Sequence, residues 1–211
     1  MIKKNLRMLI ITSIVTLIPI LVGMLLWNML PDEIATHWNA QGIADGFSSK
    51  PFAVFALPAF LLAVHWVCFI ITCADPKNKD IDGKPLALVL WICPVISLIV
   101  SSIMYSTAMG SPVSVEIIMP LLLGAMFVFI GNYMPKCKQN YTIGIKVPWT
   151  LEDEDNWNKT HRFAGIVWVI GGIIIMATAF LGSVMVMLPI TLIMAFAPMI
   201  YSYCYYKKNK K

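Results

Sequence analysis

The sequence predicts an all-α fold, that of a polytopic integral membrane protein with six transmembrane helices and both termini in the cytoplasm. Three observations lead to this prediction. Of the 211 residues, 59% are hydrophobic and only 13% are charged, whereas soluble domains average about 25% charged residues. The apolar residues form runs long enough to cross a bilayer. The basic residues gather in alternate segments between those runs, so the net charge of +5 indicates orientation in a membrane and not contact with nucleic acid.

The first predicted span is Met8–Leu30, an uncharged run that follows Lys3, Lys4 and Arg7. The run exceeds the roughly 7–15 apolar residues of a signal peptide, and no A-x-A cleavage site follows it. We therefore expect a retained helix that begins in the cytoplasm. Pro19 is expected to kink this helix, because proline lacks the backbone N–H that an α-helix needs.

The next segment, Pro31–Lys50, is rich in turn-forming residues and is predicted to be a loop outside the cell. No metal site is expected from Glu33, His37 and Asp45, because no helix fixes their spacing.

We expect Trp38 and Phe47 of this loop to rest at the membrane interface, and Asn39 and Asp45 to shape turns. The alternative is that the loop meets an extracellular ligand. Its candidate residues are Pro31, His37, Trp38, Asn39, Gly42, Asp45 and Lys50.

The remaining apolar stretches complete the count of six spans. Phe163–Tyr206 would be about 66 Å long as one helix, roughly twice the ~30 Å hydrocarbon core. It must therefore fold back, and we expect the turn near Leu181-Gly182-Ser183. The intervening spans are predicted at Phe52–Cys73, Leu86–Ala108 and Ile117–Met134, with a charged loop at Asp75–Lys84 and a turn at Gly110–Glu116.

All but one of the 16 Lys and Arg residues fall on one side of this arrangement, and the exception is Lys50. The positive-inside rule places that basic side in the cytoplasm. The chain thus divides into residues 1–50, with the first span and the outer loop, residues 51–130, with spans two to four, and residues 131–211, with a long cytoplasmic loop and spans five and six.

The longest polar segment is Gly131–Gly165. Gly144 and Pro148 predict a constrained, non-helical loop over Asn140–Trp149. Thr150 is expected to cap the helix that follows, with Asp153 reaching back to form a capping box. The acidic run Glu152, Asp153, Glu154 and Asp155 would then occupy the first helical turn, where the helix dipole favours negative charge.

A set of residues with characteristic spacing runs through this segment: Gly131-Asn132-Tyr133-Met134, Asn140-Tyr141, Gly144-Ile145, Pro148-Trp149-Thr150-Leu151, Trp157 and Lys159-Thr160-His161-Arg162-Phe163-Ala164-Gly165. The set resembles the signature of the SdpI family of bacterial membrane immunity proteins. The family usually has Arg-Thr before Pro-Trp-Thr, whereas this chain has Lys146-Val147, which replaces a bidentate donor by a point charge.

The outer loop also resembles a known module, the short DUF1648-like module of unknown function at the start of many SdpI-family proteins. The matching residues are Leu30-Pro31, Ile34, His37-Trp38-Asn39, Gly42, Asp45-Gly46 and Ser49-Lys50.

These resemblances imply immunity against a secreted antimicrobial peptide toxin, in a multi-pass protein of the bacterial plasma membrane. In some family members they also imply a receptor that captures a transcriptional repressor at the membrane. They imply no enzyme and no cofactor. The five cysteines contain no C-x-x-C pair, so neither a zinc site nor a disulfide framework is indicated. The alternative is a small-molecule transporter or channel, and a membrane enzyme is a third possibility.

Four candidate sites keep two interpretations each. His65 lies inside a span, where ionisable residues are functional candidates, but a neutral histidine bonded to a neighbouring helix is favoured. His161 could act as a general base, although no nucleophile is placed near it. Trp149 and Trp157 are favoured as interfacial anchors over ligand-stacking residues. The acidic run is favoured as a solvated helical turn over a surface that imitates phosphates for a basic repressor.

Overall fold

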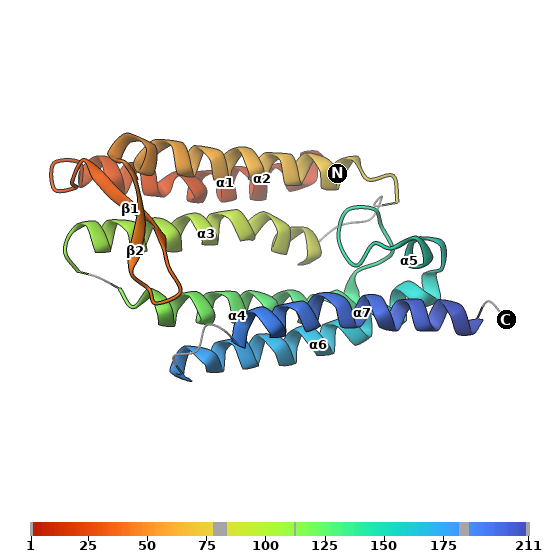
Figure 1. The fold of residues 1–211 in the computed structure, drawn as a ribbon. Helices are drawn as coiled ribbons and strands as arrows, with labels where there is room; N and C mark the ends of the chain where they lie inside the picture. Colours follow the sequence, from red (N-terminus) through yellow and green to blue (C-terminus); the bar gives the residue numbers. More distant parts are fainter. Residues whose placement is uncertain (1, 78–83, 112, 182–185, 210–211) are drawn as a thin grey trace. The chain divides into compact units, whose positions relative to one another are not determined.

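The computed structural model describes residues 2–77, 84–111, 113–181 and 186–209 (Figure 1). The chain forms two compact units, each described by itself: Met1–Cys73 with Ile81–Val115, and Ala74–Asp80 with Glu116–Lys211. Six helices in the described ranges are long and apolar enough to cross a membrane, which confirms the predicted number of spans. They are Asn5–Leu25, Phe52–Ala74, Leu86–Ala108, Val115–Lys136, Glu154–Phe180 and Met187–Asn209.

The first unit contains helices α1 (Ile2–Leu25), α2 (Leu57–Ala74) and α3 (Lys84–Ala108), with a π-helical turn, η1 (Phe52–Ala56), leading into α2. α1 and α3 run parallel, because Leu9 packs against Leu86 and Leu90 at one end while Tyr105 Oη donates to the Pro19 carbonyl 3.0 Å away near the other. α2 runs antiparallel to α1, since Phe69 joins the Leu9 cluster.

A β-hairpin joins α1 to η1, a structure that the sequence did not predict. Strand β1 (Glu33–Trp38) pairs antiparallel with β2 (Ala44–Ser49). Ile34 of β1 is fully buried in a core cluster with Leu30 and Met104. The predicted first span is therefore too long at its end, since α1 stops at Leu25. Leu30 is apolar, but it packs in the core beneath the hairpin and does not extend the helix.

The second unit contains α4 (Val115–Tyr133), the short 3-10 helix η2 (Met134–Lys136), α5 (Pro148–Glu152), α6 (Glu154–Leu181) and α7 (Met187–Asn209). α6 and α7 run antiparallel, with Trp168 Nε1 donating to the Met194 carbonyl at 2.9 Å. The predicted fold-back agrees with the end of α6 at Leu181; Gly182 and Ser183 lie outside the described residues. So does most of the predicted Asp75–Lys84 loop.

α4 and α6 approach so closely that only glycine fits at two levels. A Cβ on Gly124 would lie 2.5 Å from the Gly172 carbonyl oxygen, and a Cβ on Gly165 would lie 2.7 Å from the Gly131 carbonyl oxygen. Small residues let transmembrane backbones come into direct contact. These contacts fix the end of α4 against the start of α6, so they hold both ends of the polar segment that joins the two helices.

Candidate functional site

The signature loop, defined here as residues 137–153, folds around the side chain of Asn140. This side chain is buried, with 2% of its surface exposed. Its Oδ1 accepts hydrogen bonds from the backbone N–H groups of Thr142 and Ile143 at 2.8 and 2.6 Å. Its Nδ2 donates to the carbonyls of Lys138 and Ile143 at 2.8 and 2.9 Å. Asn140 thus replaces backbone pairing in a segment that has no regular secondary structure.

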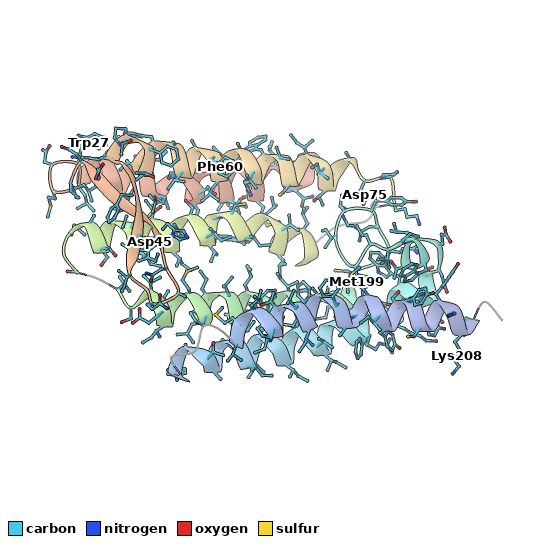
Figure 2. The ribbon with its side chains drawn as sticks, viewed as in Figure 1. Trp27, Asp45, Phe60, Asp75, Met199 and Lys208 are labelled. Atoms are coloured by element: carbon cyan, nitrogen blue, oxygen red, sulfur yellow. The ribbon has the colours of Figure 1, made fainter. Side chains whose placement is uncertain are left out.

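Asp75, in the segment that follows α2, also ties down this loop. Its Oδ2 accepts from the Tyr141 N–H at 2.7 Å and from Thr142 Oγ1 at 2.8 Å. Lys77 Nζ donates to Gln139 Oε1 and to the Leu151 carbonyl, both at 3.1 Å. Figure 2 shows Asp75 beside the loop that leads into α5. The sequence analysis placed these residues in a charged loop only, because nothing in their local pattern indicates partners 62 or more positions away.

His161 is a structural residue, because both of its ring nitrogens are engaged. Nε2 accepts from the Ile145 N–H at 3.0 Å, so the ring proton lies on Nδ1 and is donated to the Trp157 carbonyl at 2.8 Å. The ring is buried and stacks on Trp157 with centroids 4.0 Å apart. A general base needs a free nitrogen within reach of its substrate, so the interpretation of His161 as a base is wrong.

Gly144 is required where the loop crosses these rings. Its φ of +123° is a conformation that residues with side chains rarely adopt, and a Cβ there would collide with His161 Nε2 and lie 3.0 Å from the Trp157 ring. Trp157 is fully buried, and its Nε1 donates to the Cys137 carbonyl at 2.8 Å. The prediction that Trp157 is an interfacial anchor is therefore wrong.

The other tryptophan, Trp149, packs against Tyr203 and Tyr206 of α7, with ring centroids 5.3 and 5.9 Å apart. Pro148 occupies the first turn of α5, where a missing N–H costs nothing. The non-helical segment therefore ends at Val147 and not at Trp149.

Helix capping differs from the prediction. Thr150 lies inside α5, where its Oγ1 accepts from the Val147 N–H at 3.1 Å and lies 2.8 Å from the Ile145 carbonyl. The cap of α6 is Asp153, whose Oδ1 accepts from the N–H groups of Asp155 and Asn156 at 2.9 and 3.3 Å. The prediction failed because the chain makes one extra helical turn, α5, before α6 begins.

The acidic run is consequently divided among different roles. Glu154 and Asp155 lie in the first turn of α6, as predicted, whereas Glu152 ends α5. Asp155 pairs with Lys159 at 2.9 Å and accepts a short hydrogen bond from Tyr205 Oη. Glu152 and Glu154 are exposed, and among the described residues neither has an ion-pair partner.

Buried polar groups also join α6 to α7 beneath the loop. Asn156 Oδ1 accepts from Thr160 Oγ1 at 2.9 Å and from Ser202 Oγ at 2.8 Å. All three residues are fully buried. The resemblance named Thr160, but the sequence analysis missed Asn156 and Ser202, because Ser202 lies in an apolar run with no polar neighbour pattern to mark it.

Cys137, where the loop begins, is partly buried, and its burial raises the pKa of the thiol. The thiol is therefore protonated at neutral pH and is a poor nucleophile.

The hairpin of residues 33–49 buries Ile34 and Ala35 of β1 and exposes several side chains of its turn and of β2. Asn39 closes its turn, with Oδ1 accepting from the N–H groups of Gln41 and Ile43, both at 3.0 Å. Asp45 does not shape the turn as predicted: it lies in β2 and pairs with His37 at 2.5 Å. Phe47 is 59% exposed, and Ile43 is 62% exposed.

The remaining residues of the predicted outer loop lie at the base and in the turn of the hairpin. Lys50 Nζ lies 3.3 Å from Asp32 and 5.2 Å above the Trp27 ring. Trp38 packs partly buried against the core cluster of the hairpin, Gly42 adopts a φ of +73° in the turn, and Pro31 is exposed. No three potential metal ligands come together among the described residues.

His65 is bonded to a neighbouring helix in the manner that the favoured interpretation expected. Its Nε2 lies 3.0 Å from Thr12 Oγ1 of α1, and the ring is buried. On the neighbouring interface, Ser97 Oγ donates to the Thr16 carbonyl at 2.8 Å. Within the described residues, the Nδ1 of His65 has no hydrogen-bond partner.

Comparisons with known proteins found matches over both polar segments. Residues 136–202 match the model of the SdpI/YfhL protein family, and residues 14–62 match a domain of unknown function, DUF1648. The chain is 30% identical over 213 residues to "Immunity protein SdpI" of Bacillus subtilis (strain 168), covering 98% of this chain and 97% of that protein. The chain belongs to the SdpI/YfhL family. No solved structure matches it.

The two matched regions of this SdpI/YfhL-family protein coincide with its two structured polar elements. The DUF1648 match contains the hairpin, and the SdpI/YfhL match runs from the end of η2 into α7. With six helices able to span a bilayer, it is a multi-pass protein of the cell membrane. Asn140, Thr150, Trp157, Thr160 and His161 of the signature are buried structural groups. The exposed signature residues are Asn132, Tyr141, Lys146, Pro148, Lys159 and Arg162.

Proposed function

We propose that the protein is a membrane immunity protein that protects its cell from a secreted antimicrobial peptide toxin. The observation that carries this proposal is the identity, along almost the whole chain, with a protein named for immunity. The arrangement of polar groups supports it, because the buried residues of the signature loop serve the fold and leave no assembled set of reactive side chains there.

The hairpin is the element that would meet the toxin. It projects exposed apolar residues, Ile43 and Phe47, beside the polar pair of His37 and Asp45. A peptide that attacks membranes is amphipathic, and such a surface offers both kinds of contact. Under the predicted orientation the hairpin lies outside, where a secreted toxin arrives first.

Expression in a toxin-sensitive host tests the proposal. Cells carrying the protein should survive a secreted peptide toxin that kills the empty-vector strain, and a variant with Ile43 and Phe47 changed to Ser should protect less at equal membrane level. Equal killing of both strains by every peptide toxin tried would contradict immunity. If the double substitution does not change protection, the protein is still an immunity protein, but the hairpin does not bind the toxin through Ile43 and Phe47.

A second candidate function is a receptor that captures a repressor on the cytoplasmic side. Exposed Glu152 and Glu154 favour it, because the DNA-binding surface of a repressor is basic. Asp153 and Asp155 are unsuitable test positions, since they cap α6 and pair with Lys159. The test variant therefore combines Glu152→Gln and Glu154→Gln, and the control variant carries Glu116→Gln. Reporter expression and cell survival in the toxin are measured for both variants in one strain.

For the receptor, reporter expression should fall in the Glu152/Glu154 variant while survival stays unchanged, and salt should weaken the contact in vitro. Unchanged reporter expression would contradict a role of Glu152 and Glu154 in repressor binding and would leave them as solvated residues at helix ends. The transporter or channel alternative predicts solute flux in liposomes containing the purified protein. Flux that depends on His65, the buried ionisable group in α2, would favour that alternative over a receptor.

A further inference from the structure

Two exposed cations of the second unit, Lys136 and Arg162, lie where its polar segment meets apolar helices. Lys136 ends the span of α4 and is exposed. Arg162 is exposed on α6, directly before the apolar run that starts at Phe163. Among the described residues neither has an ion-pair partner. Other cations nearby are engaged: Lys159 binds Asp155 and Tyr205, and Lys77 binds two oxygens of the signature loop.

Lys136 and Arg162 come from helices that touch at this level. Pro135 of η2 packs against Gly165 of α6, where a Cβ would lie 2.9 Å from the proline ring. Lys136 is the next residue after Pro135, and Arg162 is about one helical turn before Gly165. Asn132 lies at the end of α4, four residues before Lys136 of η2, and is exposed. Its amide adds a further hydrogen-bond donor near Lys136 in the chain.

The geometry of Lys136 leaves its donors available. Its Nζ lies 5.0 Å above the Tyr133 ring, an arrangement that holds the ammonium group by attraction to the ring face without using its three N–H bonds. Arg162 adds a planar set of donors that suits phosphate oxygens.

The surface on the membrane side of these cations is apolar. Phe129, four residues before Tyr133 on α4, is 63% exposed, and Ile166, four residues after Arg162 on α6, is 58% exposed. Soluble phosphate or an acidic peptide would make no use of these side chains. A phospholipid fits both parts, with its phosphate at the cations and its acyl chains along Phe129 and Ile166.

We propose that Asn132, Lys136 and Arg162 bind the phosphate of an anionic phospholipid headgroup at the boundary of α4 and α6. The site requires neither the immunity function nor the receptor function. Bound lipid would hold together the helices whose ends carry the signature loop.

Lipid titration of the purified protein in detergent tests this site. Phosphatidylglycerol should bind and raise the midpoint of thermal unfolding, whereas phosphatidylcholine and inorganic phosphate should do neither. Each basic residue near a membrane contributes about a fivefold factor in affinity, so Lys136→Gln with Arg162→Gln should weaken phosphatidylglycerol binding about 30-fold. The charge-preserving pair Lys136→Arg with Arg162→Lys should retain most of the binding.

The charge-matched control is Lys138→Gln with Lys146→Gln, two exposed lysines of the signature loop, which should lower the affinity far less. Equal losses in the test and control variants would overturn the site, since they would indicate attraction by net charge alone. Full binding by the Lys136/Arg162 variant would also overturn it. So would stabilisation by inorganic phosphate equal to that by phosphatidylglycerol, because the acyl chains would then have no role.

Discussion

The hairpin of residues 33–49 and the signature loop of residues 137–153 are both short polar segments between apolar helices, yet they place their side chains in opposite ways. The hairpin satisfies its backbone by strand pairing, which leaves Ile43, Asp45 and Phe47 exposed. The loop lacks such pairing and satisfies its backbone with buried side chains, chiefly Asn140 and His161.

Polar residues in a loop can therefore serve either recognition or the fold itself. In the hairpin the outward side chains are available for recognition, and substitutions there need not affect folding. In the signature loop most polar side chains are part of the fold, so a loss of function after mutation there does not by itself identify a binding residue. Variants in the two elements should therefore differ in labelling, in stability and in amide exchange.

The largest effect concerns the side of the membrane on which each element lies. Cysteines introduced at Gln41 in the hairpin turn and at Glu152 in the signature loop, in a cysteine-free background, should differ completely in labelling from outside intact cells. We expect labelling at Gln41→Cys only, because nearly all basic residues lie on the side of the signature loop. Labelling at Glu152→Cys only, or at both, would disprove the orientation with both termini inside.

Gly144→Ala should strongly destabilise the signature loop. It combines an unfavourable φ with a collision against His161, and we expect a cost of about 3 kcal/mol in the free energy of unfolding. Gly110 is a matched control, since its φ is +80° and nothing lies within 4 Å of an added Cβ. Gly110→Ala should cost about 1–2 kcal/mol. Equal costs in denaturant unfolding would mean that the His161 and Trp157 rings do not enclose Gly144.

Asn140 of the signature loop and Asn39 of the hairpin both organise turns, and substitution should again cost more stability in the signature loop. Asn140→Ala removes a buried network and should cost about 2–4 kcal/mol, whereas Asn39→Ala, at the partly exposed turn of the hairpin, should cost about 1 kcal/mol. Thermal unfolding of both variants in one detergent gives the comparison. A larger loss of stability from Asn39→Ala would contradict the claim that the signature loop depends on its side chains more than the hairpin does.

The smallest effect separates the two candidate caps of α6. Asp153→Ala should cost about 1 kcal/mol and should speed amide exchange at Asp155 and Asn156, whose N–H groups it caps. Thr150→Ala should instead speed exchange at Val147. Faster exchange at Asp155 in the Thr150 variant, with none in the Asp153 variant, would restore Thr150 as the cap.

Much of the fold was predictable because its determinants are local. An apolar run of about 20 residues has few alternatives in a membrane, so the number of spans and the fold-back after α6 followed from the sequence. Span ends were less predictable, as Leu30 illustrates, because an apolar residue at a helix end can belong equally to the span or to the core beneath a hairpin.

The six spans, the two polar segments between them and the family resemblance were all predictable from the residues alone. The roles of the signature residues depend instead on tertiary contacts. Asp75 meets Tyr141 across 66 positions, and His161 receives its hydrogen bond from Ile145. Such pairs leave no trace in hydropathy or spacing, because a hydrogen bond depends on where two segments meet in space and not on the residues beside each partner. The same reason explains why the hairpin was predicted only as a loop: Ile34 stabilises it in a core built from η1, α3 and Leu30, which follows α1.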